Sequence, residues 1–427
     1  MPLELLVVLL LVIATALAFD FTNGFHDTGN AMATSIATGA LKPKTAVMLS
    51  ALLNLVGAFL SVEVALTVTN AVVNLQDEVG APRPELLMDG GEGLLLIVLS
   101  GLVGAILWNL LTWLWSLPSS SSHALFGGLV GATIAGLGFG GVNWVGDGTK
   151  LDGVVGKVIL PALVSPVVAS IVSAVGTWLV FAITRGMDEK RRERGFRWGQ
   201  VGSASLISLA HGTNDAQKTM GVITLALVAG GYQEAGTGPH WWVIASAGIA
   251  IGLGTYSGGW RIMRTMGRGL VHVEAPQGFA SETASTVAIL ASSHLGFALS
   301  TTHICTGSIL GSGVGRGSKV SWGTFGRMGV AWLVTLPCAA VVGALTSYVA
   351  VRGGVAGTVV VIIALAVGAL LIIRQANHNK VDFSNVNDAH EVVVAKRTDP
   401  SLGRPPRTLQ EVKAEFAPAP GLAVTSP

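Results

Sequence analysis

The feature that most limits the fold of this sequence is a series of apolar windows, each about as long as a bilayer is thick. The hydrocarbon core of a membrane, about 30 Å across, needs roughly 20 apolar residues in one helix. Of the 427 residues, 51% are hydrophobic and only 12% are charged, as in integral membrane proteins. The windows lack the alternating pattern of a membrane β-barrel, so we expect an all-α, polytopic bundle of about 10–12 spanning helices. The clearest windows are residues 3–19, 45–72, 94–115, 123–140, 156–184, 240–257, 322–351 and 355–373.

Charge and cysteine content exclude several other classes of protein. The formal net charge is only +2, and no basic patch is interleaved with aromatic residues, so no nucleic-acid partner is expected. Cys305 and Cys338 lie far apart in apolar segments, which is typical of buried thiols rather than of a disulfide or a metal site. We expect the lipid bilayer as a partner, and neither a bound cofactor nor a resident metal ion.

The polar segments between the windows differ in charge. Residues 185–200 contain six basic and three acidic residues, whereas residues 73–93 contain one basic and five acidic residues. The positive-inside rule places residues 185–200 in the cytoplasm, which predicts a multi-pass protein of the cell (cytoplasmic) membrane. Residues 374–427 lose the apolar pattern and are expected to form a polar, flexible tail.

Two pairs of motifs repeat in the same order along the chain. GFHDTGNAM at residues 24–32 aligns with GTNDAQKTM at residues 212–220, and SSSHALFGGLVG at 120–131 aligns with STTHICTGSILG at 300–311. The order indicates a duplication, with a first transmembrane repeat at 1–184, a basic cytoplasmic loop at 185–200 and a second repeat at 201–373. Such duplications in transporters are commonly inverted, with broken helices or re-entrant hairpins around a binding site at the midplane. The inversion is an expectation from that architecture, because the sequence itself does not show it.

Two runs of hydroxyl residues each precede a segment of small residues. Each run is typical of a chain break followed by a helix N-terminus, where unpaired backbone N–H groups and the helix dipole favour an anion. Two such termini facing each other would hold one tetrahedral oxyanion, although a single run can also be an ordinary cap. The candidate substrate-binding residues are Ser120, Ser121, Ser122, Ser300, Thr301 and Thr302.

Asp27 and Asp215 occupy matching positions in the other repeated motif. An ionised aspartate inside a bilayer costs at least about 2.5 kcal/mol, so it usually lines a cavity, pairs with a cation or takes up a proton. The alternative is a buried helix cap. Hydrogen phosphate can donate a hydrogen bond to a carboxylate, whereas sulfate offers only acceptors, so paired aspartates favour phosphate over sulfate.

Other polar residues in these segments are weaker candidates. Lys218 aligns with Asn30 and can pair with Asp215, three residues earlier, although such a pair can also be purely local. His26 can relay protons, and Glu282 lies in an otherwise apolar segment. A hydrolase using a serine and a histidine is not favoured, because the sequence lacks the Gly-x-Ser-x-Gly and His-Glu-x-x-His motifs.

NGFHDTGNAMAT and HGTNDAQKTMGVI, together with LPSSSSH and STTH, resemble motifs of the inorganic phosphate transporter (PiT) family, particularly its bacterial low-affinity branch. The resemblance implies a secondary transporter of inverted-repeat design that imports phosphate with a cation. The family's signature is an Asn-Asp pair with a second Asn three residues after the Asp, and the matching residues are Asp27, Asn30, Asn214 and Asp215. The resemblance also assigns phosphate binding to the two hydroxyl triplets, and Glu282 matches a glutamate of many members.

The departures from the family pattern bear on the coupled ion. His26 replaces the first Asn, Lys218 replaces the second-half Asn, and Asn54 stands where animal members often have glutamate. In sodium-coupled members the Asp and Asn groups are expected to bind sodium, so we hypothesise that the ammonium of Lys218 takes one cation position. This hypothesis favours proton symport, with Asp27 or His26 taking up the proton. Sodium coupling, a sulfate permease of the same fold, transport of phosphate as a complex with magnesium or another divalent metal, and a homodimer all stay open.

Overall fold

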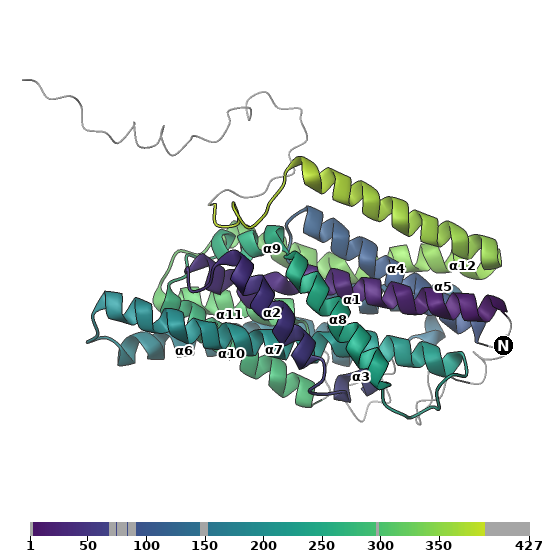
Figure 1. Ribbon diagram of the computed structural model, residues 1–427, viewed down its shortest axis with the longest axis horizontal. Coiled ribbons are helices and arrows are strands. Elements are labelled where there is room, and N and C mark those ends of the chain that lie inside the picture. The colour runs from purple at the N-terminus through teal and green to yellow at the C-terminus, as the bar shows by residue number, and fades with distance from the viewer. Residues whose placement is uncertain are drawn as a thin grey trace, which may run out of the picture. The chain divides into compact units, whose positions relative to one another are not determined.

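The computed structural model describes residues 3–67, 74, 83, 91–145, 153–295 and 299–388, and these form an almost entirely helical bundle (Figure 1). Within these ranges the only β pairing is an isolated bridge between Val271 and Val320. All described elements belong to one compact unit, residues 1–392. The all-α prediction is therefore confirmed, and most of the predicted tail lies outside the described residues.

The helices follow one another in a simple order along the chain. They are α1 (Leu3–Ala37), α2 (Pro43–Gly57), α3 (Glu63–Thr67), α4 (Glu92–Leu114), α5 (Ser121–Leu137), η2 (Phe139–Gly141), the π-helix η3 (Val155–Ile159), α6 (Leu160–Ile183), α7 (Glu189–Ala229), α8 (Trp241–Ser257), α9 (Trp260–Arg264), the π-helix η4 (Thr265–Gly269), α10 (Ala275–His294), α11 (Thr301–Arg316) and α12 (Trp322–His378). Among the described residues, four helical stretches are both long and apolar enough to cross a membrane: Leu3–Ala37, Glu92–Leu114, Val155–Ile183 and Trp322–His378.

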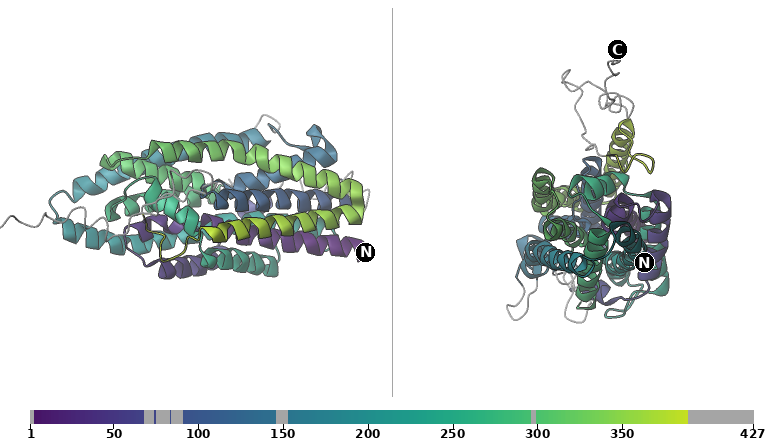
Figure 2. Two further views of the ribbon diagram at one scale, coloured as in Figure 1. Left: turned by 90° about the horizontal axis from the view of Figure 1, so that it is seen from above. Right: turned by 90° about the vertical axis from the view of Figure 1, so that its left-hand side faces the viewer.

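Several predicted boundaries differ from the observed ones. The window at 45–72 is not one helix, because α2 ends at Gly57 and α3 is a separate short helix. The expected loop at 185–200 is largely helical, since α7 begins at Glu189 behind an Asp188 cap whose carboxylate accepts from the Arg191 N–H. The windows at 322–351 and 355–373 are two arms of α12, separated by Gly354 with φ +52°. The two arms run in opposite directions (Figure 2), and the second extends five residues past the predicted end at 373.

The two aspartate motifs lie in the middles of long, unbroken helices. α1 has 35 residues and α7 has 41, and they pack against each other in opposite directions. Thr38, after the end of α1, donates to the Gln200 side chain near the start of α7, whereas Leu9 near the start of α1 lies beside Gly230 at the end of α7. The chain is therefore interrupted at the hydroxyl runs and not at the aspartates.

Two helical hairpins carry the hydroxyl runs. α4 and α5 pack antiparallel, as do α10 and α11, and in each hairpin the second helix begins at the hydroxyl run. Ser120 and Ser300 are the N-caps, and their hydroxyls accept the backbone N–H of His123 at 3.2 Å and of His303 at 3.3 Å. The predicted breaks and helix starts are thus confirmed at both runs.

Matching glycines of the two hairpins make matching close contacts. A Cβ atom on Gly131 of α5 would overlap the carbonyl oxygen of Ala340 in α12, and one on Gly311 of α11 would overlap that of Ser170 in α6. Each hairpin helix therefore packs against the last long helix of the other predicted half.

We expect Gly311→Val to destabilise the protein by about 1–3 kcal/mol, the usual cost of overpacking, because the α6 backbone cannot yield as a side chain would. The midpoint of thermal unfolding of the purified protein in nanodiscs measures this effect. Gly323→Ala is the matched control, since a Cβ there meets no atom within 4 Å. Equal midpoints for the two variants would show that the α6–α11 contact is looser than described.

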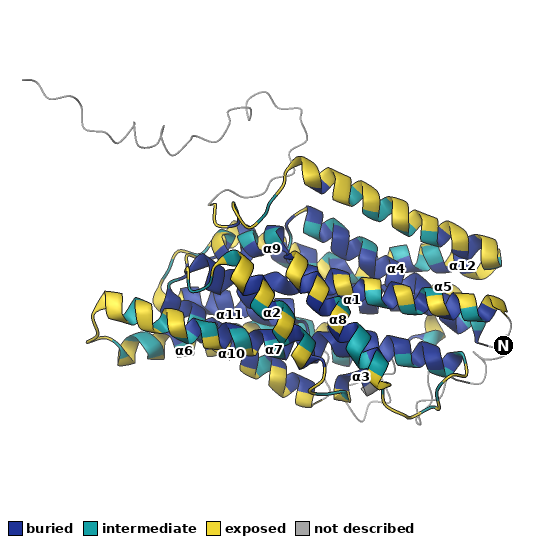
Figure 3. Cartoon of the chain, in the orientation of Figure 1, coloured by how far each residue is buried: buried dark blue, intermediate teal, exposed yellow. Residues whose placement is uncertain are grey.

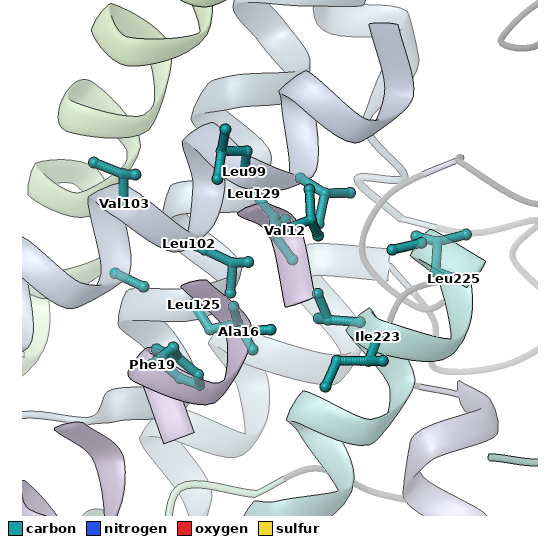
Figure 4. Packing of buried hydrophobic residues seen from close by; sticks show 14 of the residues in the cluster. Val12, Ala16, Phe19, Leu99, Leu102, Val103, Leu125, Leu129, Ile223 and Leu225 are labelled. Atoms are coloured by element: carbon teal, nitrogen blue, oxygen red, sulfur yellow. The ribbon is translucent and has the colours of Figure 1, made fainter. Parts of the chain in front are cut away.

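Apolar residues divide into a buried core and an exposed belt. Val12, Ala16 and Phe19 of α1 pack against Leu102 of α4 and Leu125 of α5 in the core (Figure 4). In contrast, α6 and the second arm of α12 expose many of their side chains (Figure 3), and the exposed residues include large apolar ones. A water-soluble protein rarely exposes such a surface, whereas lipid tails cover it at no cost.

Candidate functional site

The N-termini of α5 and α11 point at the middles of α1 and α7. Ser121 at the start of α5 lies 3.3 Å from Asp27, and Thr302 at the start of α11 lies 3.4 Å from the same carboxylate. Thr301 lies 3.1 Å from Asp215. Two positive helix ends and their hydroxyls therefore converge on the two aspartates that the sequence singled out.

Asp27 is held by hydroxyls and by its neighbour His26. The His26 Nδ1 atom lies 2.7 Å from Asp27 Oδ1, and the opposite ring nitrogen lies 3.2 Å from the Thr112 hydroxyl and 3.3 Å from that of Ser119. All four residues are buried. Asp27 does not cap its own helix, because it lies ten residues before the end of α1.

Asp215 has a cationic partner. Lys218 makes an ion pair with Asp215, and the same ammonium donates to the Ser122 hydroxyl at 2.6 Å. His211 Nε2 lies 2.9 Å from the other oxygen of Asp215, and His211 Nδ1 lies 3.2 Å from Asn54. The predicted pairing of Lys218 with Asp215 is therefore present, and through Ser122 it also reaches the hairpin helix α5.

Asn30 and Asn214 occupy different surroundings. The Asn30 amide donates to the Thr302 hydroxyl at 3.0 Å, which ties α1 to the start of α11. Asn214 is fully buried, and within the described part of the chain neither of its amide atoms has a hydrogen-bond partner. Because buried amides are normally paired, Asn214 is a group that a ligand or water can satisfy.

Glu282 lies in a second polar cluster. Thr34 donates to its carboxylate at 2.6 Å, Gln200 at 3.1 Å and Ser203 at 2.5 Å. These contacts join α10 to α1 and α7 but do not include Asp27 or Asp215. The candidate role of Glu282 in cation coupling stays a prediction.

The charges of the centre do not cancel among themselves. Asp27, Asp215 and His211 each offer one ligand atom, and these three atoms lie within 4.8 Å of one another. Lys218 supplies one fixed positive charge for two carboxylates, in a region where bare charge is costly. The centre can therefore accept a further cation or a proton, and its hydroxyls and helix ends can accept an anion.

Sequence reasoning missed several residues of this centre. Thr112 and Ser119 contact His26. Thr112 is a single hydroxyl in an apolar window and carries no distinctive signal, whereas Ser119 begins the serine run but is not among the candidate residues. Asn54, noted in the sequence only as a departure from the family pattern, is buried in α2, donates to Thr255 at 2.7 Å and contacts His211. Of the two cysteines, Cys305 is buried and Cys338 half-buried, both as free thiols.

Long antiparallel helices, an exposed apolar surface and a charged centre buried between the helix middles are typical of a membrane transporter. Residues 23–343 match the model of the Phosphate transporter family. The chain belongs to this family, whose members are transporters and not enzymes.

Known relatives and a solved structure agree with that assignment. The chain is 56% identical over 385 residues to a "Probable low-affinity inorganic phosphate transporter" of Mycobacterium bovis, covering 90% of this chain and 87% of the relative. It is 38% identical over 346 residues to a protein of the same description from Bacillus subtilis, covering 81% and 98%. A solved structure described as "The sodium-dependent phosphate transporter" superposes with a TM-score of 0.69 at 21% identity, covering 82% of this chain and all of that one. At that identity the superposition shows a shared fold.

Proposed function

We propose that this protein imports inorganic phosphate across the cytoplasmic membrane by symport with protons. The observation that carries the proposal is the pair of facing helix N-termini, α5 and α11, whose hydroxyls reach Asp27 and Asp215. Family membership and the descriptions of the relatives support phosphate as the substrate.

The chemistry of the centre supports hydrogen phosphate rather than sulfate. The hydroxyls of Ser121, Thr301 and Thr302 donate to the carboxylates and can turn to donate to phosphate oxygens instead. A protonated phosphate can then donate its own O–H to Asp27 or Asp215. Fully ionised sulfate has no such donor and would leave a carboxylate facing an anion.

The opposite directions of α1 and α7 support an inverted repeat. The two helices carry the aligned aspartate motifs, and the contacts of Gly131 and Gly311 relate the hairpins in the same way. In such a design, one set of helices rocks against the other and opens the central site to each side in turn. The division at residues 184 and 201 is part of this proposal.

Basic residues support an orientation with the α6–α7 junction in the cytoplasm. Arg316 at the end of α11 and Arg192 at the start of α7 both stack on Phe181 near the end of α6. The α1 N-terminus lies at the opposite end of the bundle (Figure 1). By the positive-inside rule the chain enters the membrane from the outer side, and phosphate is released near the basic end.

Lys218 supports protons as the coupled ion. Its ammonium already neutralises Asp215, in the position where the family pattern has a neutral Asn. The remaining carboxylate, Asp27, contacts His26, and both can carry a proton. The alternative is a sodium ion, or a divalent metal carried with phosphate, held by Asp27, His211 and Asp215, which are close enough together to share a cation.

Radiolabelled phosphate uptake into proteoliposomes tests the proposal. Proton and sodium gradients are imposed separately, each with and without magnesium and excess sulfate. We expect uptake driven by the proton gradient, independent of sodium and magnesium, and unaffected by sulfate. Uptake driven only by sodium would show that sodium, and not the proton, is the coupled ion. Dependence on magnesium would favour transport of a metal–phosphate complex. Accumulation of sulfate instead of phosphate would overturn the substrate assignment.

A further inference from the structure

Asp20 is a buried carboxylate that the phosphate centre described above does not include. It lies on α1 seven residues before Asp27, or about 10 Å nearer the N-terminus of the helix. Its side chain has no solvent exposure, and it lies about two turns from Asp27 in the direction that the proposed orientation makes extracellular. A fully buried aspartate without a role in the centre requires its own explanation.

Polar groups surround Asp20 without neutralising it. The Thr219 hydroxyl and the Asn23 side chain are its polar neighbours, and among the described residues no hydrogen bond of normal geometry reaches either carboxylate oxygen. The charged groups facing it are Asp215 and Lys218, both on α7. Asp215 repels a second negative charge, and Lys218 is already paired with Asp215.

The other helices packed against α1 bring no cation to this point. The ionisable residues of α4 and α8 are Glu92, at the start of α4, and Tyr256, near the end of α8. His123 of α5 and His303 of α11 meet edge to face, with ring centroids 4.8 Å apart. Three cations of α2 and α9 contact other parts of the chain: Lys44 of α2 stacks on Phe383, Arg261 of α9 donates to Ala376 and Asn379, and Arg264 donates to Asn385. Arg268 of η4 and His294 of α10 are exposed.

We propose that Asp20 is a proton-binding site on the extracellular side of the phosphate centre, and that a coupled proton enters the transport cycle there. This inference rests on the proposed function. A carboxylate that is buried, faces a second carboxylate and has no cation of its own is stabilised by taking up a proton. The neutral acid then has an O–H donor, and the Thr219 hydroxyl on α7 is placed to accept it.

The position of Asp20 links proton binding to the contact between α1 and α7. Asp20 and Thr219 belong to the two antiparallel helices that carry Asp27 and Asp215. A hydronium ion on the outer side gives its proton to an Asp20 oxygen: one O–H bond of the hydronium breaks, one O–H bond forms on the carboxylate, and a water molecule leaves. The reverse transfer to water releases the proton when the inward-facing state hydrates that side chain. Protonation of Asp20 thus favours the closed contact between α1 and α7 in the transporter that holds phosphate and proton.

The steady-state accumulation of phosphate in proteoliposomes tests this site. A pH difference of about one unit supports about tenfold accumulation for each coupled proton. We expect Asp20→Asn to lower the accumulation ratio about tenfold at that gradient, while phosphate–phosphate exchange at equal pH stays close to the wild-type rate. Asp20→Glu, which keeps an ionisable group, is the matched control and should retain the wild-type ratio.

Each outcome decides the inference. An Asp20→Asn protein that accumulates phosphate like the wild type, or a correctly folded one that loses exchange as well, overturns it. If Asp20→Asn does not fold, Thr219→Val tests the same site. Loss of the hydroxyl should shift the pH dependence of phosphate uptake without changing the accumulation ratio. An unshifted pH profile would refute the site. A wild type without proton-driven phosphate uptake would instead disprove the proposed function.

Discussion

Replacing Lys218 by asparagine is expected to make phosphate uptake dependent on sodium. Lys218 is buried and its ammonium contacts Asp215 and Ser122, where it substitutes for an external cation. Asparagine restores the family's pattern and leaves Asp215 without that charge, so sodium can bind near the oxygens of Asp215 and Asp27. The measurement is initial phosphate uptake with sodium or choline as the only added cation, for wild type and variant.

The thermal stability of the same variant should also depend on sodium. Removing one partner of a buried ion pair costs about 3–5 kcal/mol, because the other charge stays buried alone. The unfolding midpoint of Lys218→Asn should therefore fall in choline and recover in sodium, whereas the wild-type midpoint should respond to neither salt. Lys218→Arg keeps the charge and is the control. If wild-type uptake already requires sodium, and Lys218→Asn does not change that requirement, the role given to Lys218 is refuted.

Replacing Thr301 by valine is expected to reduce phosphate uptake by about 10- to 150-fold. The Thr301 hydroxyl lies at the N-terminus of α11, 3.1 Å from Asp215 and 3.5 Å from Asp27. Valine has the same shape but no donor, and a hydrogen bond to a charged group contributes about 1.5–3 kcal/mol. Uptake at several phosphate concentrations separates weaker binding from slower turnover.

Thr306→Val is the matched control for this prediction. Thr306 lies on the same helix and is fully buried, and no hydrogen-bond partner of its hydroxyl is found in the described ranges. Its replacement should leave uptake within about twofold of the wild type, because no hydrogen bond is lost. Equal losses in the two variants would show that α11 tolerates no valine, and equal retention would place phosphate away from Thr301.

Much of the fold follows from local pattern. Apolar length predicted the most apolar helices but not α7 or α10, which lie outside the apolar windows. The hydroxyl runs after Pro118 and Leu299 predicted where α5 and α11 begin. The pattern failed where tertiary contacts decide the structure. The aspartate motifs with their glycines suggested interruptions, yet α1 stays helical through Gly24 because the backbone of α8 packs directly on that glycine.

The site was predictable where residues repeat and hidden where they do not. Asp27, Asp215 and both hydroxyl triplets stood out because the duplication marks them twice, and Lys218 stood out because it departs from the repeated pattern. The structure brings these residues together. Thr112 and Asp20 belong to no repeated motif, so only packing reveals that they face His26 and α7. Glu282 was noticed from its apolar segment and from the family resemblance, neither of which identified its partners, Gln200 and Ser203.

The exchange of helices between the two halves bears on how the chain is synthesised. α5 packs on the first arm of α12, and α6 packs on α11, so each half is completed by a helix of the other. While the ribosome is still translating the second half, the glycine face of α5 has no partner in the bilayer. In the proposed two-repeat design, the first half therefore cannot reach its final packing before the first arm of α12 has been translated.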